Sequence, residues 1–140
     1  CSTKKNRVSF QQLYKEGDKL FFDGSPFNGI GYSLYRNNQL EVEAQFRNGK
    51  ADGYYKKWTK SGLLKIEGRN KDGMKSGTER EWRSTDEGKR YLYYEKNYLE
   101  DKLHGQSRSW YHGGELQSTI FNYKLGVKHG VQKRWHFAKN

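Results

Sequence analysis

A short pattern recurs five times along the chain and constrains its fold more than any other feature. In each copy an x-Gly dipeptide is followed, five residues after the glycine, by a large apolar residue. The glycines of successive copies are 24, 24, 28 and 25 residues apart. All four tryptophans of the chain occupy this one position, which indicates stacked copies of one small structural unit. The copies run from Asn28-Gly29 to Leu34, Asp52-Gly53 to Trp58, Ser76-Gly77 to Trp82, His104-Gly105 to Trp110 and His129-Gly130 to Trp135.

Each copy carries two turn signals, so it reads as strand, turn, strand, turn. A second glycine precedes the anchor glycine by four residues in three copies, at Gly49, Gly73 and Gly126, whereas Asp101 fills that position before Gly105. Dipeptides rich in glycine and asparagine favour hairpin turns because such turns need positive φ. The other turns fall between the copies, at Asn37-Asn38, Ser61-Gly62, Glu87-Gly88 and Gly113-Gly114.

The second strand of each copy alternates between apolar and polar side chains, which is the period of a half-buried strand. Leu40, Val42, Ala44 and Phe46 are expected on one side, opposite charged and polar neighbours. Only 32% of the 140 residues are hydrophobic, which is too few for a thick core. Because 16% are aromatic, the composition indicates a folded, thin layer in which aromatic rings supply most of the packing. We therefore predict an all-β fold: a single-layer, elongated antiparallel meander of repeated β-hairpins with about ten strands.

Two columns of side chains are expected on one face of this sheet. The third residue after each anchor glycine is tyrosine once and basic four times, and the fifth is the large apolar residue. The aromatic column is explained by packing, with basic stems lying across the rings. The basic column is either a solvated face or a docking strip for an acidic partner. The candidate partner-binding residues are Tyr32, Lys56, Arg80, Arg108 and Lys133, with Trp58, Trp82, Trp110 and Trp135 beside them.

The chain begins with its single cysteine, Cys1, followed by a short polar and basic segment. A cysteine in the first position is what remains when a bacterial lipoprotein signal peptide is removed, so we expect Cys1 to carry a diacylglycerol and an acyl chain. The alternative is a cut that falls at this cysteine by accident. We place a lipoprotein tether at residues 1–9 and the repeat domain at residues 10–140. Residues 8–14 read as either a short helix or half a repeat.

The recurring pattern N/D-G-x-x-x-G/H-G-x-x-x-x-W/Y-x-x-x-G-x-L resembles the MORN-repeat variant of YwqK-like proteins. Residues 50–58 and 61–64 match it best, and residues 25–29 resemble the frequent opening of the family. The resemblance covers about residues 17–137 and implies a fold of β-hairpin repeats. Members of that family include toxin–antitoxin components and envelope lipoproteins, and related MORN proteins act as scaffolds, dimerisers and lipid-headgroup binders.

The residues predict no catalytic or metal site. No spacing of His, Cys, Asp and Glu matches a metal centre, and no nucleophile–base set stands out. His104 and His129 precede anchor glycines and are expected to be turn residues. No apolar run is long enough for a transmembrane helix. We expect no cofactor beyond the lipid on Cys1.

We therefore expect a non-enzymatic, lipid-anchored interaction or scaffold module at the bacterial outer membrane, an accessory subunit of an envelope protein complex. An antitoxin or immunity protein of a YwqK-like pair is the alternative that the resemblance implies. Binding to anionic lipid or nucleic acid is a second alternative, which the net charge of +11 permits. Nucleic acid is disfavoured as a partner because glutamates are interspersed along the same strands.

Overall fold

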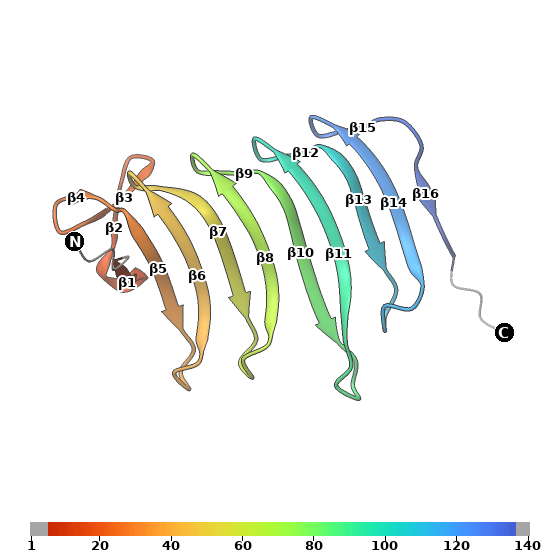
Figure 1. Cartoon of the computed structure of the whole chain (residues 1–140), viewed down its shortest axis with the longest axis horizontal. Coiled ribbons are helices and arrows are strands. Elements are labelled where there is room, and N and C mark those ends of the chain that lie inside the picture. The colour runs from red at the N-terminus through yellow and green to blue at the C-terminus, as the bar shows by residue number, and fades with distance from the viewer. Residues whose placement is uncertain (1–5, 137–140) are drawn as a thin grey trace, which may run out of the picture. The chain divides into compact units, whose positions relative to one another are not determined.

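The computed structural model describes residues 6–136, and these form an all-β, mostly antiparallel fold in meander-like order (Figure 1). This confirms the predicted fold class. The chain divides into two compact units, Cys1–Met74 and Lys75–Asn140. The short strand β9 (Met74–Lys75) lies at the division between them.

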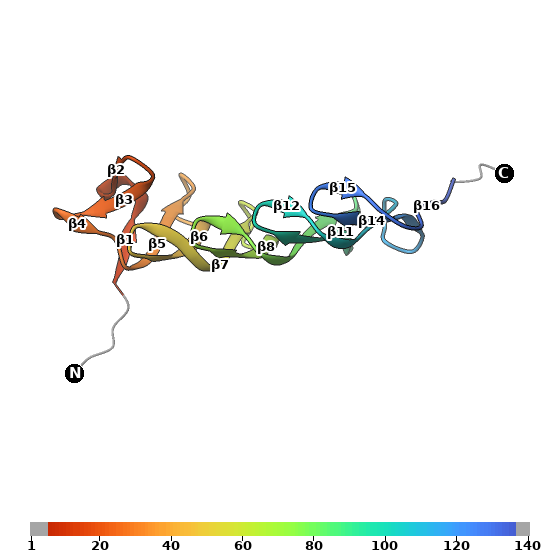
Figure 2. The same ribbon diagram turned by 90° about the horizontal axis from the view of Figure 1, so that it is seen from above.

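The main sheet of the first unit follows the order β1-β5-β6-β7-β8. A second sheet of three short strands, in the order β2-β3-β4, lies beside this layer when the unit is seen from above (Figure 2). The elements are β1 (Arg7–Ser9), the 3-10 turn η1 (Phe10–Gln12), β2 (Tyr14–Glu16), β3 (Lys19–Phe22), β4 (Ser25–Pro26), β5 (Gly29–Leu34), β6 (Leu40–Arg47), β7 (Lys50–Trp58) and β8 (Leu64–Lys71).

The start of the first unit differs from the sequence expectation. Arg7–Ser9 form β1, which pairs parallel to β5, so these three residues belong to the sheet and not to a tether. The backbone nitrogen of Ile30 also donates a hydrogen bond to the carbonyl of Asn6 at 2.7 Å. The segment left open between helix and half repeat is neither, because η1 is one turn between two short strands.

The second unit is an antiparallel meander in which β10, β11, β13 and β14 follow one another. The short strand β12 pairs with β11, and both β15 and β16 pair with β14. The elements are β10 (Gly77–Ser84), β11 (Arg90–Leu99), β12 (Lys102–Leu103), β13 (Gly105–Trp110), β14 (Gln117–Lys124), β15 (Val127–Lys128) and β16 (Lys133–Arg134).

Residues 6–136 contain more strands than the ten expected, because the first strand of most copies is split near its anchor glycine. The pairs β4 and β5, β9 and β10, β12 and β13, and β15 and β16 each represent one predicted strand. The anchor glycines all have positive φ, for example 111° at Gly53 and 87° at Gly105. Glycine adopts such angles without strain, so the glycine that recurs in each copy meets a requirement of the backbone.

A β-bulge recurs just before the large apolar position in every complete copy. In the first copy Ser33 pairs with Val42 and Leu34 pairs with Leu40, so Glu41 is the extra residue. The same shift falls between Lys57 and Trp58 in the first unit, and before Trp82 and Trp110 in the second. The second strand was expected to place Leu40 and Val42 on the same side of the sheet. The bulge changes this, because it places Leu40 beside Leu34, on the side opposite Val42.

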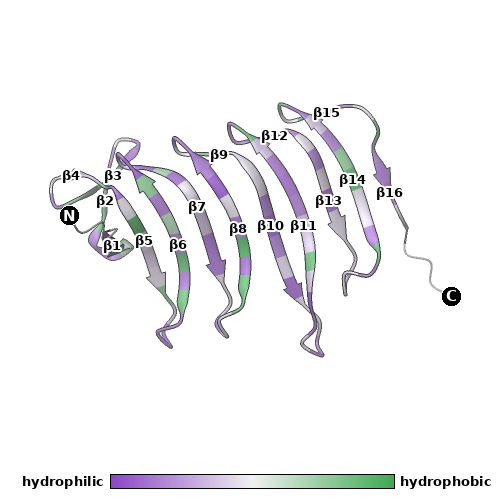
Figure 3. Ribbon diagram, in the orientation of Figure 1, coloured by the Kyte–Doolittle hydropathy of each residue, from purple (hydrophilic) through white to green (hydrophobic). Residues whose placement is uncertain are grey.

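Burial within each unit is slight, as expected for a single layer. Val8, Phe27 and Ala44 are the buried hydrophobic residues of the described part of the first unit, and Tyr91 is that of the second. Phe27, only 2% exposed, lies 5.7 Å from the ring of Phe46, which in turn meets the ring of Phe10 at 6.0 Å. Hydrophobic segments on β6, β8 and β14 alternate with hydrophilic ones (Figure 3).

Candidate functional site

The sheet register places a carboxylate between the basic side chains predicted for partner binding. In the first unit Glu43 pairs with both Tyr32 and Lys56, and Glu67 pairs with Lys56 on its other side. In the second unit Glu95 pairs with both Arg80 and Arg108. Facing residues of an antiparallel pair point to the same side of the sheet, so each set forms a row on one face. We call these the first-unit row and the second-unit row.

Charges in the first-unit row are balanced. Arg7 forms an ion pair with Glu43, and its guanidinium lies 4.7 Å from the ring centroid of Tyr32. The hydroxyl of Tyr54 donates to Glu43 at 2.8 Å, while the ammonium of Lys56 lies 5.1 Å from the Tyr54 ring. Burial and then the hydrogen bond to Glu43 raise the pKa of Tyr54. This row therefore offers no excess positive charge to a partner.

The second-unit row has an excess of positive charge. Arg80 Nε donates to Glu95 Oε2 at 2.9 Å, yet the Arg80 side chain remains 41% exposed. Arg108 Nε donates to the Gln106 side chain, and Arg108 is exposed. Lys133, also exposed, pairs in the register with Ile120, which faces Arg108 on its other side. Within residues 6–136 neither Arg108 nor Lys133 forms an ion pair with a carboxylate, so this row carries excess positive charge.

The tryptophan positions are neither a closed core nor freely exposed. Trp58, Trp82 and Trp110 are half-buried, and Trp135 is 41% exposed. The guanidinium of Arg90, which lies on β11 and outside the predicted basic column, is 4.6 Å from the Trp82 ring centroid. In the corresponding position of the first copy, Leu34 is exposed. The sequence left open whether the tryptophans pack or serve as a surface. In the structure each of them does both, with part of the side chain packed and part exposed.

A tyrosine hydroxyl links neighbouring copies at the tryptophan position. Tyr35, which follows the first large apolar residue, donates to the carbonyl of Trp58 at 2.7 Å. In the second unit Tyr111 donates in the same way to the carbonyl of Trp135. These bonds satisfy backbone groups beside the bulges and hold successive copies in register.

The opposite face of the second unit buries acidic side chains, which sequence reasoning treated as ordinary cross-strand partners. Glu79, 5% exposed, accepts from the Tyr94 hydroxyl at 2.6 Å and from the Lys75 ammonium at 2.8 Å. Burial, followed by the influence of Glu79, raises the pKa of both Tyr94 and Tyr98. Burial alone would lower the pKa of Lys75, but its hydrogen bond to Glu79 raises it overall. The network is compensated and has a structural role.

The residue before an anchor glycine serves the next hairpin turn. The Asn28 side-chain oxygen accepts from the backbone nitrogen of Asn48 at 2.9 Å, and His104 Nδ1 accepts from that of Leu125 at 3.2 Å. His104 itself lies between β12 and β13 and not in a turn, and its side chain instead caps the turn at Leu125. Among residues 6–136 no group of three or more His, Cys, Asp or Glu side chains is placed to hold a metal ion.

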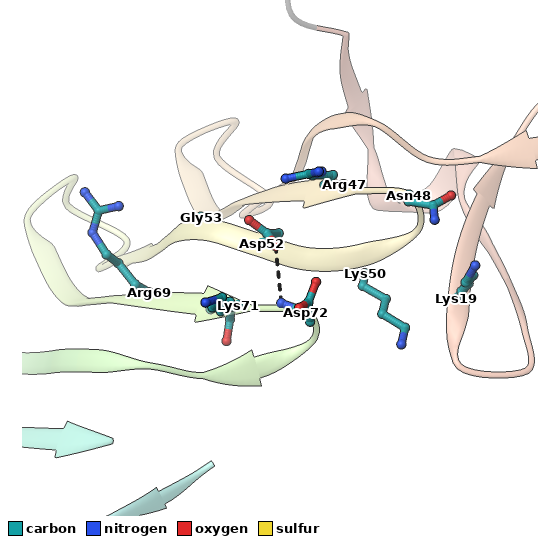
Figure 4. Close-up of a pocket in the computed structure, with 10 residues that line it drawn as sticks. Lys19, Arg47, Asn48, Lys50, Asp52, Gly53, Arg69, Lys71 and Asp72 are labelled. Carbon is teal, nitrogen blue, oxygen red and sulfur yellow. Dashed lines mark hydrogen bonds between the residues drawn. The ribbon is translucent and has the colours of Figure 1, made fainter. Parts of the chain in front are cut away.

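A pocket of about 600 Å³ in the first unit was missed by sequence reasoning (Figure 4). It lies where β6 turns into β7 and where β8 ends, with β3 at its side (Figure 4). The only signal in the sequence is the set of basic residues flanking the second glycine of the repeat. Its lining residues are Lys19, Arg47, Asn48, Lys50, Asp52, Gly53, Arg69, Asn70, Lys71 and Asp72.

The pocket is lined by five basic residues and two aspartates. Lys50 lies 3.3 Å from Asp18, and its hydrogen bond and charge lower the pKa of that exposed carboxyl. Asp52 accepts from the backbone nitrogen of Asp72 at 3.2 Å. Within the described part of the chain no ion pair engages the four remaining cations, which are Lys19, Arg47, Arg69 and Lys71. Four cations of the described residues thus line one cavity without an ion-pair partner.

The lipidation prediction falls on Cys1, which lies outside the described residues. No helix in residues 6–136 is long and apolar enough to cross a membrane. No family model matches the chain, and no curated protein sequence is significantly similar to it.

Proposed function

We propose that the chain is a non-enzymatic interaction module that binds an acidic protein partner through the second-unit row. The observation that carries the proposal is the excess of positive charge there, where Arg108 and Lys133 flank Ile120 and form no ion pair among residues 6–136. The balanced first-unit row provides the internal contrast. Complementary charge steers association and selects partners.

The residue types of the second-unit row also favour a protein partner. Trp110 follows Arg108 by two residues on β13, and Trp135 follows Lys133 by two residues just after the end of β16, so aromatic side chains lie near the basic ones. Tryptophan, tyrosine and arginine are the residues that most often dominate the energy of protein interfaces. Charged side chains separate the apolar side chains of the second-unit row, so this face does not suit a purely apolar partner. An acidic protein with its own apolar contacts fits this face.

The proposal keeps the expected cellular setting, namely a MORN-variant lipoprotein acting as an accessory subunit of an outer-membrane complex. The test is purification of the full chain, tagged at its C-terminus, from its own cells in mild detergent, followed by identification of stoichiometric partners. A captured partner is then purified and titrated against the wild type and Arg108→Gln. Lys128→Gln is the matched control, because Lys128 is exposed and pairs with Tyr123 on the opposite face.

We expect Arg108→Gln to weaken binding about tenfold, as for loss of one charged interfacial contact, and Lys128→Gln to leave it unchanged. Equal affinities of the two variants would refute the assignment of this face. Stoichiometric capture of a toxic soluble protein would instead support the antitoxin alternative.

A further inference from the structure

We infer that the pocket of the first unit binds a phosphorylated carbohydrate, either free or carried on a lipid. This inference concerns a different unit from the proposed partner-binding row and does not rest on it. It starts from the four unpaired cations that line one cavity of about 600 Å³, a volume suited to a small molecule.

The cations converge because the repeat places them at equivalent sites on neighbouring strands. Arg47 pairs in register with Lys50 across the β6–β7 turn, and Arg69 and Lys71 lie two residues apart on β8. Arg69 faces Tyr54 on β7, the strand that also carries Asp52. These side chains therefore belong to the same face of the sheet.

Lys19 reaches the same pocket from β3, which is fixed to the β6–β7 turn by backbone hydrogen bonds. The nitrogen of Leu20 donates to the carbonyl of Gly49 at 2.8 Å, and the nitrogen of Gly49 donates to the carbonyl of Phe27 at 2.9 Å. Phe27 is the most buried side chain described, so this wall of the pocket is anchored in the small core of the unit. The site is preformed, not assembled from loose loops.

The charges select a polyanion, with phosphate the best match. Arginine presents a planar fork of donors that suits phosphate oxygens, and lysine supplies a point charge beside it. Five basic residues against two aspartates line the cavity, and the ion pair of Lys50 with Asp18 leaves an excess of two positive charges around it. A ligand with two phosphate groups would neutralise this excess.

The remaining lining residues select a hydroxyl-rich body for that ligand. None of the ten lining residues is aromatic, so the pocket has no platform on which a nucleobase could stack. Asp52 and Asp72 would repel phosphate but accept hydrogen bonds from hydroxyl groups. A carboxylate has several acceptor positions, so the bond from the Asp72 nitrogen to Asp52 leaves others for a ligand. Asn48 and Asn70 add amide donors and acceptors.

The test uses calorimetric titration of the full chain with fructose 1,6-bisphosphate, with fructose and inorganic pyrophosphate as comparison ligands. We expect the bisphosphate to bind, fructose not to bind, and pyrophosphate to bind more weakly. The double variant Arg47→Gln with Lys71→Gln should lose about tenfold or more in affinity, since two charged contacts are removed. Both side chains are exposed, so the fold should persist, and an unchanged urea midpoint verifies this.

The matched control is Lys60→Gln with Lys65→Gln, which removes the same charge from exposed residues of the same unit outside the pocket. Equal loss of affinity in both double variants would overturn the site, because charge alone would then explain binding. Pyrophosphate binding as tightly as the sugar would overturn the carbohydrate assignment. Asp52→Asn with Asp72→Asn should reduce the preference for the sugar over pyrophosphate, and an unchanged preference counts against the hydroxyl role.

A second arm separates the free from the lipid-borne ligand. Phosphatidylcholine vesicles containing a diphosphorylated glycolipid, lipid A, are sedimented with the protein, and vesicles without it serve as the blank. Binding to these vesicles without binding to the free sugar would place the ligand on a membrane. Failure of both arms would overturn the inference.

Discussion

Gly53 is an anchor glycine at which an added Cβ would meet a hydrogen-bonded side chain, so Gly53→Ala provides a strict test of the repeat geometry. Its φ is 111°, and a Cβ added there would lie 2.1 Å from the side-chain oxygen Oε1 of Gln45. That oxygen accepts a hydrogen bond from the backbone nitrogen of Tyr54 at 3.0 Å. The substitution therefore strains the backbone and displaces a bond that holds the strand at its anchor.

The cost follows from these two effects. Holding alanine at positive φ costs about 1–2 kcal/mol. Displacing Gln45 removes one intramolecular hydrogen bond, about 1 kcal/mol, and leaves a half-buried amide without its partner. We expect Gly53→Ala to lower the free energy of unfolding of the first unit by about 2–4 kcal/mol. Gly73→Ala is the matched control, because its φ is 85° and a Cβ there finds its nearest neighbour at 3.9 Å, so it should cost only the backbone term.

Urea unfolding followed by tryptophan fluorescence measures both variants, with the slope m compared before midpoints are converted to free energies. The double variant Gly53→Ala with Gln45→Ala tests the cause, because it removes the clash while keeping the strain. We expect the double variant to be about 1 kcal/mol more stable than the sum of the single effects predicts. A Gly53→Ala cost no larger than that of Gly73→Ala, or purely additive effects, would refute the reasoning.

Three further predictions concern other parts of the chain. Ionisation of Tyr94 and Tyr98 opposes folding, because the pKa values of both hydroxyls are raised in the folded unit. Their contribution to the free energy of unfolding is therefore complete below pH 10 and is lost as the pH rises above it. Tyr94→Phe should reduce the loss of stability at alkaline pH, measured by urea unfolding across a pH series. Tyr35→Phe removes the hydrogen bond from the Tyr35 hydroxyl to the carbonyl of Trp58 and should lower the free energy of unfolding by about 1 kcal/mol in urea. An unchanged free energy of unfolding would show that this hydrogen bond does not stabilise the contact between copies. Cys1→Ala should abolish membrane association, and recovery of this variant in the membrane pellet at high salt would contradict lipid anchoring.

The repeat made most of the fold predictable, because its glycines report backbone angles directly. Asn48-Gly49 and Asp72-Gly73, predicted as turns, have positive φ at both residues. The turn at Glu100 and Asp101 adopts the same angles without a glycine, so position in the repeat outweighed residue preference there. The short extra strands beyond the expected meander arise because most anchor glycines, at positive φ, interrupt the ladder of their own strand.

Other features could not be predicted because they depend on register and on contacts distant in sequence. The bulge at Glu41 has no signature in residue type, yet it moves Leu40 to the other side of the sheet. The parallel pairing of β1 arises from a segment with no repeat pattern. The pocket requires Lys19 to meet residues near 50 and 70, which no spacing along the chain indicates. The residues of the basic and aromatic columns were predicted from the repeat. The carboxylates that lie between the basic residues could be identified only from the pairing of the strands.

The pairing of strands decides where the net charge of +11 can act. A basic column on alternate strands becomes a neutral row when each intervening strand supplies a carboxylate, as Glu43 and Glu67 do for Lys56. Ile120 replaces that carboxylate between Arg108 and Lys133, so one apolar residue on the intervening strand leaves two cations uncompensated. Ile120→Glu should therefore cancel the excess with little effect on pairing, since cross-strand opposite charges are stabilising. If the proposed partner bound this variant as tightly as the wild type, charge in the second-unit row would not be what it recognises.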